Sequence, residues 1–333
     1  MASTIRDVAA RAGLSVGTVS KYINGKTVKN NTRLAIEAAV KDLNFRPNSI
    51  AKGLRNAKSF SVAVLLPMLS SMFCTSMISS IEATLLPLGY SVIVCECHND
   101  AEVELRKTQF LIDRLVDGII LIPYGVDGRQ IEIIQKNNIP LVLLDQVIKD
   151  WPTDCVVLDN EKAGYESTRY LIEQGHKNIA IITGDFSHYT TVGRLAGYKR
   201  AMQESGISNQ TAYIQCGDYS VDGGYNAMLR LWALPTRPSA VFISNHDMTI
   251  GAYLAINYLK LKIPDDISVI GFDNSPLANV VNPPLSFAEQ PTNQMGIEAG
   301  KLLYRRICGD YSDYPRIIYH KPSMHYTESI RKL

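Results

Sequence analysis

The chain has 333 residues, of which 46% are hydrophobic and 20% are charged, and its formal net charge at pH 7 is +2. This is the composition of a soluble globular protein, and the length predicts about two domains with a large core. No apolar run reaches the length of a transmembrane helix and no signal peptide is evident, so we expect a cytoplasmic protein.

The small net charge hides an asymmetry along the chain. Residues 1–60 hold 11 Lys and Arg against 3 Asp and Glu, a net charge of +8. The remaining residues carry 23 basic against 29 acidic side chains, a net charge of −6. A basic N-terminal segment on an acidic body predicts a polyanionic partner for that segment only.

The first 25 residues predict two short helices joined by a tight turn at Gly13. Thr4 and Asp7 have the spacing of a capping box, and Ser15 can cap the second helix, in which Val19 faces inward. The outward side chains of that helix are small, polar or basic: Gly17, Thr18, Lys21 and Asn24. Such a face near a helix N-terminus suits insertion into the major groove of DNA. An ordinary helical hairpin is the alternative.

The segment 13–17 also matches the G-x-S-x-G pattern of hydrolases, but a helix rather than a strand precedes its serine, which argues against that chemistry. A third helix is expected over residues 31–43, capped by Asn30 or Asn31. Its expected buried stripe is Leu34, Ala35, Ala38, Ala39 and Leu43. Residues 44–59 are basic and polar and are too short to form a stable helix alone. They predict a linker that folds only in contact with other structure, and a plain tether is the alternative.

Beyond residue 61, short apolar runs alternate with amphipathic helical stretches, such as 101–115, 163–174 and 250–261. The apolar runs are 62–67, 91–96, 118–123, 140–145, 155–159, 179–183, 240–244 and 268–273. This repeated β-α order predicts parallel sheets covered by helices on both faces, in two lobes with a cleft between them. Ligands of such sheets bind beyond the carboxyl ends of the strands, where Asp145, Asp159, Thr183, Asn245 and Asp273 stand here.

Nothing in the sequence predicts a metal, a cofactor or a catalytic centre. The six cysteines form no zinc-type pair and are interpreted as reduced core thiols, and the six histidines lack metal-ligand spacing. Asp265 and Asp266 are interpreted as a polar loop rather than a catalytic pair. Because no nucleophile, base and orienting group come together at the strand ends, we do not expect an enzyme.

Six stretches in this order make the chain resemble the LacI/GalR family of bacterial transcription regulators over essentially its full length: 4–20, 45–54, 116–120, 193–198, 269–273 and 283–285. The resemblance implies an α/β protein with a helix-turn-helix head at 1–46 and a hinge helix at 47–59. The core at 60–333 would be like a periplasmic binding protein. Its first lobe would span 60–159 and 290–318, and its second lobe 160–289 and 319–333.

The resemblance further implies a homodimeric repressor that binds near-palindromic operators. A small ligand in the cleft would change its affinity for the operator. DNA contacts are implied at Ile5, Ser15, Val16, Gly17, Thr18, Lys21, Asn24, Thr32, Asn48, Ala51, Lys52, Leu54 and Arg55. Of these, Asn48, Ala51 and Leu54 would enter the minor groove. The effector pocket is implied to include Phe73, Asp145, His188, Thr190, Arg194, Tyr219, Asn245 and Asp273.

Several positions depart from the family pattern: Lys21 for the usual Arg, Lys29 for a capping Ser, Met68-Leu69 for Asp-Ile, and His246 for Asp. The implied pocket favours a sugar or sugar derivative, and His188, if protonated, would favour an acidic or phosphorylated one. A purine is the competing ligand, and a mutual pairing of Arg194 with Asp273 is the structural alternative. A solute-binding protein without a DNA role and a sugar-processing enzyme are the other classes, disfavoured by the basic head and by the missing catalytic set.

Overall fold

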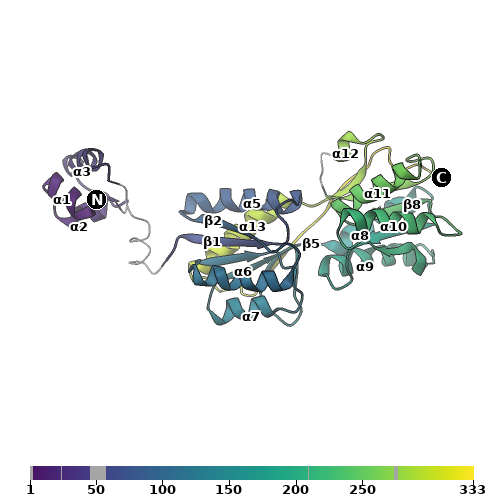
Figure 1. Ribbon diagram of the computed structural model, residues 1–333, viewed down its shortest axis with the longest axis horizontal. Coiled ribbons are helices and arrows are strands. Elements are labelled where there is room, and N and C mark those ends of the chain that lie inside the picture. Colours follow the sequence, from purple (N-terminus) through teal and green to yellow (C-terminus); the bar gives the residue numbers. More distant parts are fainter. Residues whose placement is uncertain (1–2, 24, 46–57, 209, 274–276) are drawn as a thin grey trace. The chain divides into compact units, whose positions relative to one another are not determined.

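A computed structural model describes residues 3–23, 25–45, 58–208, 210–273 and 277–333, and Figure 1 gives its ribbon. The chain divides into two compact units, residues 1–59 and 60–333. The second unit begins at Phe60, next to the expected boundary between linker and core. Each unit has its own hydrophobic core and is described by itself.

The N-terminal unit contains the helices α1 (Ile5–Ala12), α2 (Val16–Ile23) and α3 (Asn30–Asp42). Thr4 and Asp7 form the expected capping box, and the cap residue Gly13 has the left-handed φ of 65° that the turn needs. The Ser15 hydroxyl accepts a hydrogen bond from the amide of Thr18 at 3.2 Å, as a cap of α2 does. The core of this unit is formed by Val8, Ala9, Val19, Ile36 and Ala39.

Two expectations for α3 were wrong. The side chain of Leu34 is 51% exposed, and Ile36 rather than Leu34 points into the core. The buried stripe is therefore rotated, because the partners α1 and α2, not the local apolar pattern, decide which face is covered. Neither Asn30 nor Asn31 caps the helix: Lys29 occupies the cap position and makes no capping hydrogen bond through its side chain.

The first lobe of the core is built on a six-stranded, all-parallel sheet in the order β11-β5-β4-β3-β1-β2. Its strands are β1 (Ser61–Leu66), β2 (Ser91–Glu96), β3 (Gly118–Leu121), β4 (Leu141–Leu144), β5 (Asp154–Leu158) and β11 (Ile317–His320). The helices α5 (Met72–Leu85) and α13 (Thr292–Ile307) cover one face. The other face is covered by α6 (Ala101–Asp113) and α7 (Arg129–Lys136). Both faces of the central strands β1, β3, β4 and β5 are buried, which is why these four consist of nearly continuous apolar runs.

The second lobe repeats this architecture in the order β12-β10-β9-β8-β6-β7, with only β12 antiparallel. Its strands are β6 (Ile179–Thr183), β7 (Ile214–Cys216), β8 (Ala240–Ile243), β9 (Ser268–Phe272), β10 (Ser286–Glu289) and β12 (Ser323–His325). On one face lie α8 (Asn160–Glu173) and α9 (Tyr189–Glu204). On the other lie α10 (Val221–Trp232) and α11 (His246–Tyr258), while α12 (Leu277–Val280) follows β9.

The chain passes between the lobes three times: after β5, after β10 and after β11. The last passage lies beyond His320 rather than at residue 318, because β11 pairs with β5 through His320 and Leu158. Four strands, β7, β10, β11 and β12, are not predicted from the sequence. All four are short, with three or four residues each, and none is a continuous apolar run.

Candidate ligand cavity and nucleic-acid interface

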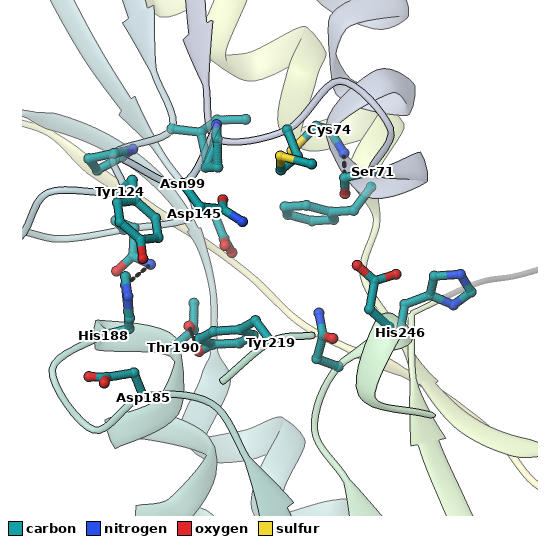
Figure 2. Close-up of a pocket in the computed structure, with 18 of the residues that line it drawn as sticks. Ser71, Cys74, Asn99, Tyr124, Asp145, Asp185, His188, Thr190, Tyr219 and His246 are labelled. Atoms are coloured by element: carbon teal, nitrogen blue, oxygen red, sulfur yellow. Dashed lines mark hydrogen bonds between the residues drawn. The ribbon is translucent and has the colours of Figure 1, made fainter. Parts of the chain in front are cut away.

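A cavity of about 590 Å³ lies between the two lobes, at the carboxyl ends of their strands. It is lined by the residues that follow β1, β3 and β4 in the first lobe and β6, β7, β8 and β9 in the second. All eight residues expected in the effector pocket line this cavity: Phe73, Asp145, His188, Thr190, Arg194, Tyr219, Asn245 and Asp273. Figure 2 shows Tyr124 and Asp145 facing Thr190 and Tyr219 across open space.

Two aspartates occupy equivalent positions, directly after the last residues of β4 and β9. Asp145 and Asp273 both have left-handed backbones, with φ of 67° and 72°. Burial raises the pKa of Asp145 to about 7, and it also raises the pKa of Asp273, while the nearby Arg194 opposes both shifts. Asp273 accepts a hydrogen bond from Gln290 Nε2 at 2.5 Å, but Asp145 Oδ1 is buried without a partner among the described residues.

Arg194, on α9, is only 3% exposed and is held from three sides. Its Nε donates to Asn160 Oδ1 at 2.8 Å and its Nη1 donates to the carbonyl oxygen of Ser244 at 2.5 Å. Its guanidinium carbon lies 3.7 Å from the centre of the Phe272 ring. The described side chains form no ion pair between Arg194 and Asp273, so the alternative in which these two groups lock each other is wrong.

An aromatic wall closes the side formed by the second lobe. The Tyr219 hydroxyl lies 2.7 Å from Thr190 Oγ1 and 2.6 Å from Thr191 Oγ1, so Thr190 positions this ring. The ring packs so closely on Gly184 that a Cβ there would lie 2.1 Å from it. The His188 ring meets the Tyr219 ring edge to face, with 5.6 Å between centroids.

Burial lowers the pKa of His188, and Asp185 opposes this shift only in part. His188 is therefore neutral at pH 7. The expectation that a protonated His188 favours an acidic or phosphorylated sugar finds no support, because burial disfavours the imidazolium in this cavity.

Several lining residues are not predicted from the sequence, among them Asn99, Tyr124, Gln146 and Gln290. Tyr124 and Gln146 closely follow strands that the sequence does predict. They could have been found from the expectation that ligands bind beyond the carboxyl ends of parallel strands. Gln290 follows β10, which was not recognised, and no local signal marks it. Asn245 uses its Oδ1 to accept from the Met248 amide at 3.1 Å, which leaves its NH₂ group for a ligand.

In the N-terminal unit, α2 presents an exposed polar face. Ser15, Val16, Gly17 and Lys21 are exposed, whereas Ile5, Thr18 and Thr32 are half-buried. Val19, on the opposite side of α2, is fully buried. Asn24, Asn48, Ala51, Lys52, Leu54 and Arg55 lie outside the described residues.

The described part of the chain holds no group of three His, Cys, Asp or Glu side chains that could bind a metal ion. All six cysteines are free thiols. None of the described helices is long and apolar enough to cross a membrane.

Two family models match the chain. Residues 4–48 match bacterial regulatory proteins of the lacI family, and residues 168–330 match the periplasmic binding protein-like domain. The ribose operon repressor of Escherichia coli (strain K12) is 33% identical over 307 residues, which cover 92% of this chain and 93% of that protein. The HTH-type transcriptional repressor PurR of Proteus mirabilis is 34% identical over 322 residues, covering 96% of this chain and 94% of that protein.

Among solved structures, the Lac repressor dimer bound to operator and the anti-inducer ONPF superimposes with a TM-score of 0.87. It is 25% identical and covers 99% of this chain and 100% of that one. The 33% and 34% identity to the two repressors extends over nearly the whole chain, N-terminal unit and core together. It therefore shows more than a shared fold. The chain therefore belongs to the lacI family of bacterial regulatory proteins and is a DNA-binding transcription regulator.

Proposed function

We propose that a sugar or sugar derivative, bound in the cavity between the lobes, controls the affinity of this regulator for its operator. The observation that carries the proposal is the convergence of two strand-end carboxylates, an amide and a guanidinium beside aromatic rings in one cavity of about 590 Å³. Carboxylates accept hydrogen bonds from adjacent hydroxyls, and aromatic faces cover the apolar face of a sugar ring. The ribose operon repressor among the relatives supports a sugar.

Operator binding would occur as a homodimer, as in the Lac repressor structure, with two heads on two half-sites. Such a regulator acts in the cytoplasm, where it meets chromosomal DNA. The hinge residues Asn48, Ala51 and Leu54, which lie outside the described residues, would enter the minor groove at the centre of the site.

Replacing Asp273 or Asp145 by Asn should weaken sugar binding by about 1.5–3 kcal/mol, because a hydrogen bond from a ligand hydroxyl to a charged acceptor is lost. The measurement is calorimetry with a panel of neutral sugars, sugar acids, sugar phosphates and purines. Asp265→Asn is the matched control, since Asp265 is exposed near the opposite end of β9 from Asp273. Equal affinity of wild type and both folded variants for a ligand would contradict the pocket assignment.

Sugar binding should weaken as the pH falls below 7. A hydroxyl donates to the ionised form of Asp145, whose pKa burial raises to about 7. Below that pH the carboxyl is protonated before the ligand binds, so the association constant should fall roughly tenfold per pH unit down to about pH 5.5. Titration calorimetry between pH 5.5 and 8.5 measures this slope. In Asp145→Asn the dependence around pH 7 should disappear, and a flat profile in the wild type would exclude Asp145 as an acceptor.

Lys21→Ala should weaken operator binding about tenfold more than it weakens binding to random DNA. Lys21 is exposed on α2 and can reach base edges, whereas phosphate contacts act on all sequences alike. The operator is obtained by selecting random-sequence DNA with the protein, and affinities are measured at one salt concentration. Lys41→Ala, which removes an exposed positive charge near the end of α3, should weaken both DNAs by the same factor. If Lys21→Ala weakened binding to the operator and to random DNA by the same factor, Lys21 would be a phosphate contact and not a base contact.

A further inference from the structure

Carboxylates dominate the charged lining of the cavity. Among the lining residues that the structure describes, seven are Asp or Glu, one is Arg and none is Lys. Four of the acids are engaged by neighbouring side chains: Asp127 by Arg129, Asp185 by Ser187, Asp218 by Ser220 and Glu289 by His325. The other three are Asp145, Asp247 and Asp273, of which Asp273 accepts a hydrogen bond from the neutral amide of Gln290. Arg194 is the one Arg or Lys among the described lining residues, so the carboxylates outnumber the permanent cations of the cavity.

Part of the donor capacity of Arg194 is already in use within the protein. Its Nε and Nη1 already donate to Asn160 and to the Ser244 carbonyl, and one face of its guanidinium lies on Phe272. The positive charge of Arg194 also lowers the pKa of Asp145 and of Asp273, so it stabilises the ionised forms of both carboxyl groups. A phosphate or carboxylate in the cavity would therefore compete with these two aspartates for one cation.

Among the cavity-lining residues that the structure describes, the two buried side-chain atoms without a hydrogen-bond partner are acceptors. Gln290 is 4% exposed and donates from Nε2 to Asp273 Oδ1 at 2.5 Å. The reverse orientation of the amide would place two acceptor oxygens against each other, so the free atom is Oε1. Gln290 Oε1 and Asp145 Oδ1 are both buried without a hydrogen-bond partner in the described part of the chain. A buried acceptor of this kind calls for a donor on the ligand.

Helix N-termini are the usual backbone sites for anions, and at three of those near this cavity one amide is already engaged by a side chain. At the start of α5, the Cys74 amide donates to Ser71 Oγ, as Figure 2 shows. The Met248 amide of α11 donates to Asn245 Oδ1, and the Tyr189 amide of α9 donates to Gln146 Oε1 at 3.2 Å.

We propose that the effector is a neutral or amino sugar, which presents hydrogen-bond donors and no negative charge, and that the cavity rejects sugar phosphates and sugar acids. This inference rests on the proposed function and narrows its ligand class. The excess carboxylates repel an anion, and they attract an ammonium group.

The test uses matched ligands on the full-length protein: ribose with ribose 5-phosphate, and glucose with glucosamine, gluconate and glucose 6-phosphate. Affinities are measured by calorimetry at pH 8. In every set that binds, the anionic member should bind at least about 30-fold more weakly than its neutral parent, and glucosamine should bind at least as tightly as glucose.

Asp247→Asn removes one negative charge at nearly constant size and should narrow the gap between neutral and anionic members. Asp265→Asn, the same change at an exposed site away from the cavity, should leave the gap unchanged. An anionic member that binds as tightly as its neutral parent would overturn the inference and leave a sugar effector standing. Binding of purines alone, or of no member of the panel, would overturn both.

Discussion

Arg306→Met should lower the free energy of unfolding of the core by about 3–5 kcal/mol. Arg306 on α13 and Asp154 on β5 form a bidentate pair, with Nε–Oδ2 and Nη2–Oδ1 distances of 2.6 and 3.0 Å. Their side chains are 1% and 0% exposed. Without the guanidinium, the Asp154 carboxylate would remain buried with no opposite charge, and this is what makes the removal of one partner so costly.

This pair also secures the segment that leads from α13 into β11, within the first lobe. Asp154 Oδ1 accepts from the Arg316 amide at 2.8 Å, directly before β11, so the loss should loosen that edge of the sheet. Denaturant unfolding measures the effect. The matched control is Arg305→Met, because Arg305 is partly exposed and pairs with Asp310 and Asp313 at the surface, where about 1 kcal/mol or less is expected. Equal losses in the two variants would contradict the special role of the buried pair.

Gly164→Ala should destabilise the second lobe by about 3 kcal/mol and weaken sugar binding at the same time. The helices α8 and α9 cross so closely that a Cβ on Gly164 would lie 2.0 Å from the carbonyl oxygen of Arg194. A backbone atom cannot rotate away as a side chain can, so the helices must separate. That separation would pull Arg194 from Asn160, which begins α8 and accepts its hydrogen bond at 2.8 Å.

Thermal or denaturant unfolding measures the first effect and calorimetry the second. Gly300→Ala on α13 is the control, because there the nearest atoms to the added methyl group belong to the Thr84 side chain, at 3.2 Å, and the Ile81 carbonyl oxygen lies at an ordinary contact distance of 3.7 Å. This variant should lose much less stability and keep its sugar affinity. A Gly164→Ala protein with the stability and the sugar affinity of the wild type would show that the packing of α8 on α9 does not set the position of Arg194.

The sequence by itself determined the features that depend on neighbours along the chain. The capping box of Thr4 and Asp7, the turn at Gly13 and the apolar runs of the central strands are local patterns, and the structure contains all of them. The positions of Asp145 and Asp273 at strand ends also follow from these runs, since parallel strands place their carboxyl ends along one edge. The basic head could be predicted from charge alone.

Only the tertiary structure decided what depends on residues far apart in the chain. The inward face of α3 is set by α1 and α2, and the short edge strand β11 exists because β5 supplies its hydrogen bonds. Likewise, the 2.5 Å contact of Gln290 with Asp273 and the engagement of Arg194 by Asn160 and Ser244 join distant segments. In the described part of the chain, the acceptors Gln290 Oε1 and Asp145 Oδ1 are left buried without a partner. Burial, which shifts the pKa values of Asp145 and His188, is likewise created only when the two lobes come together.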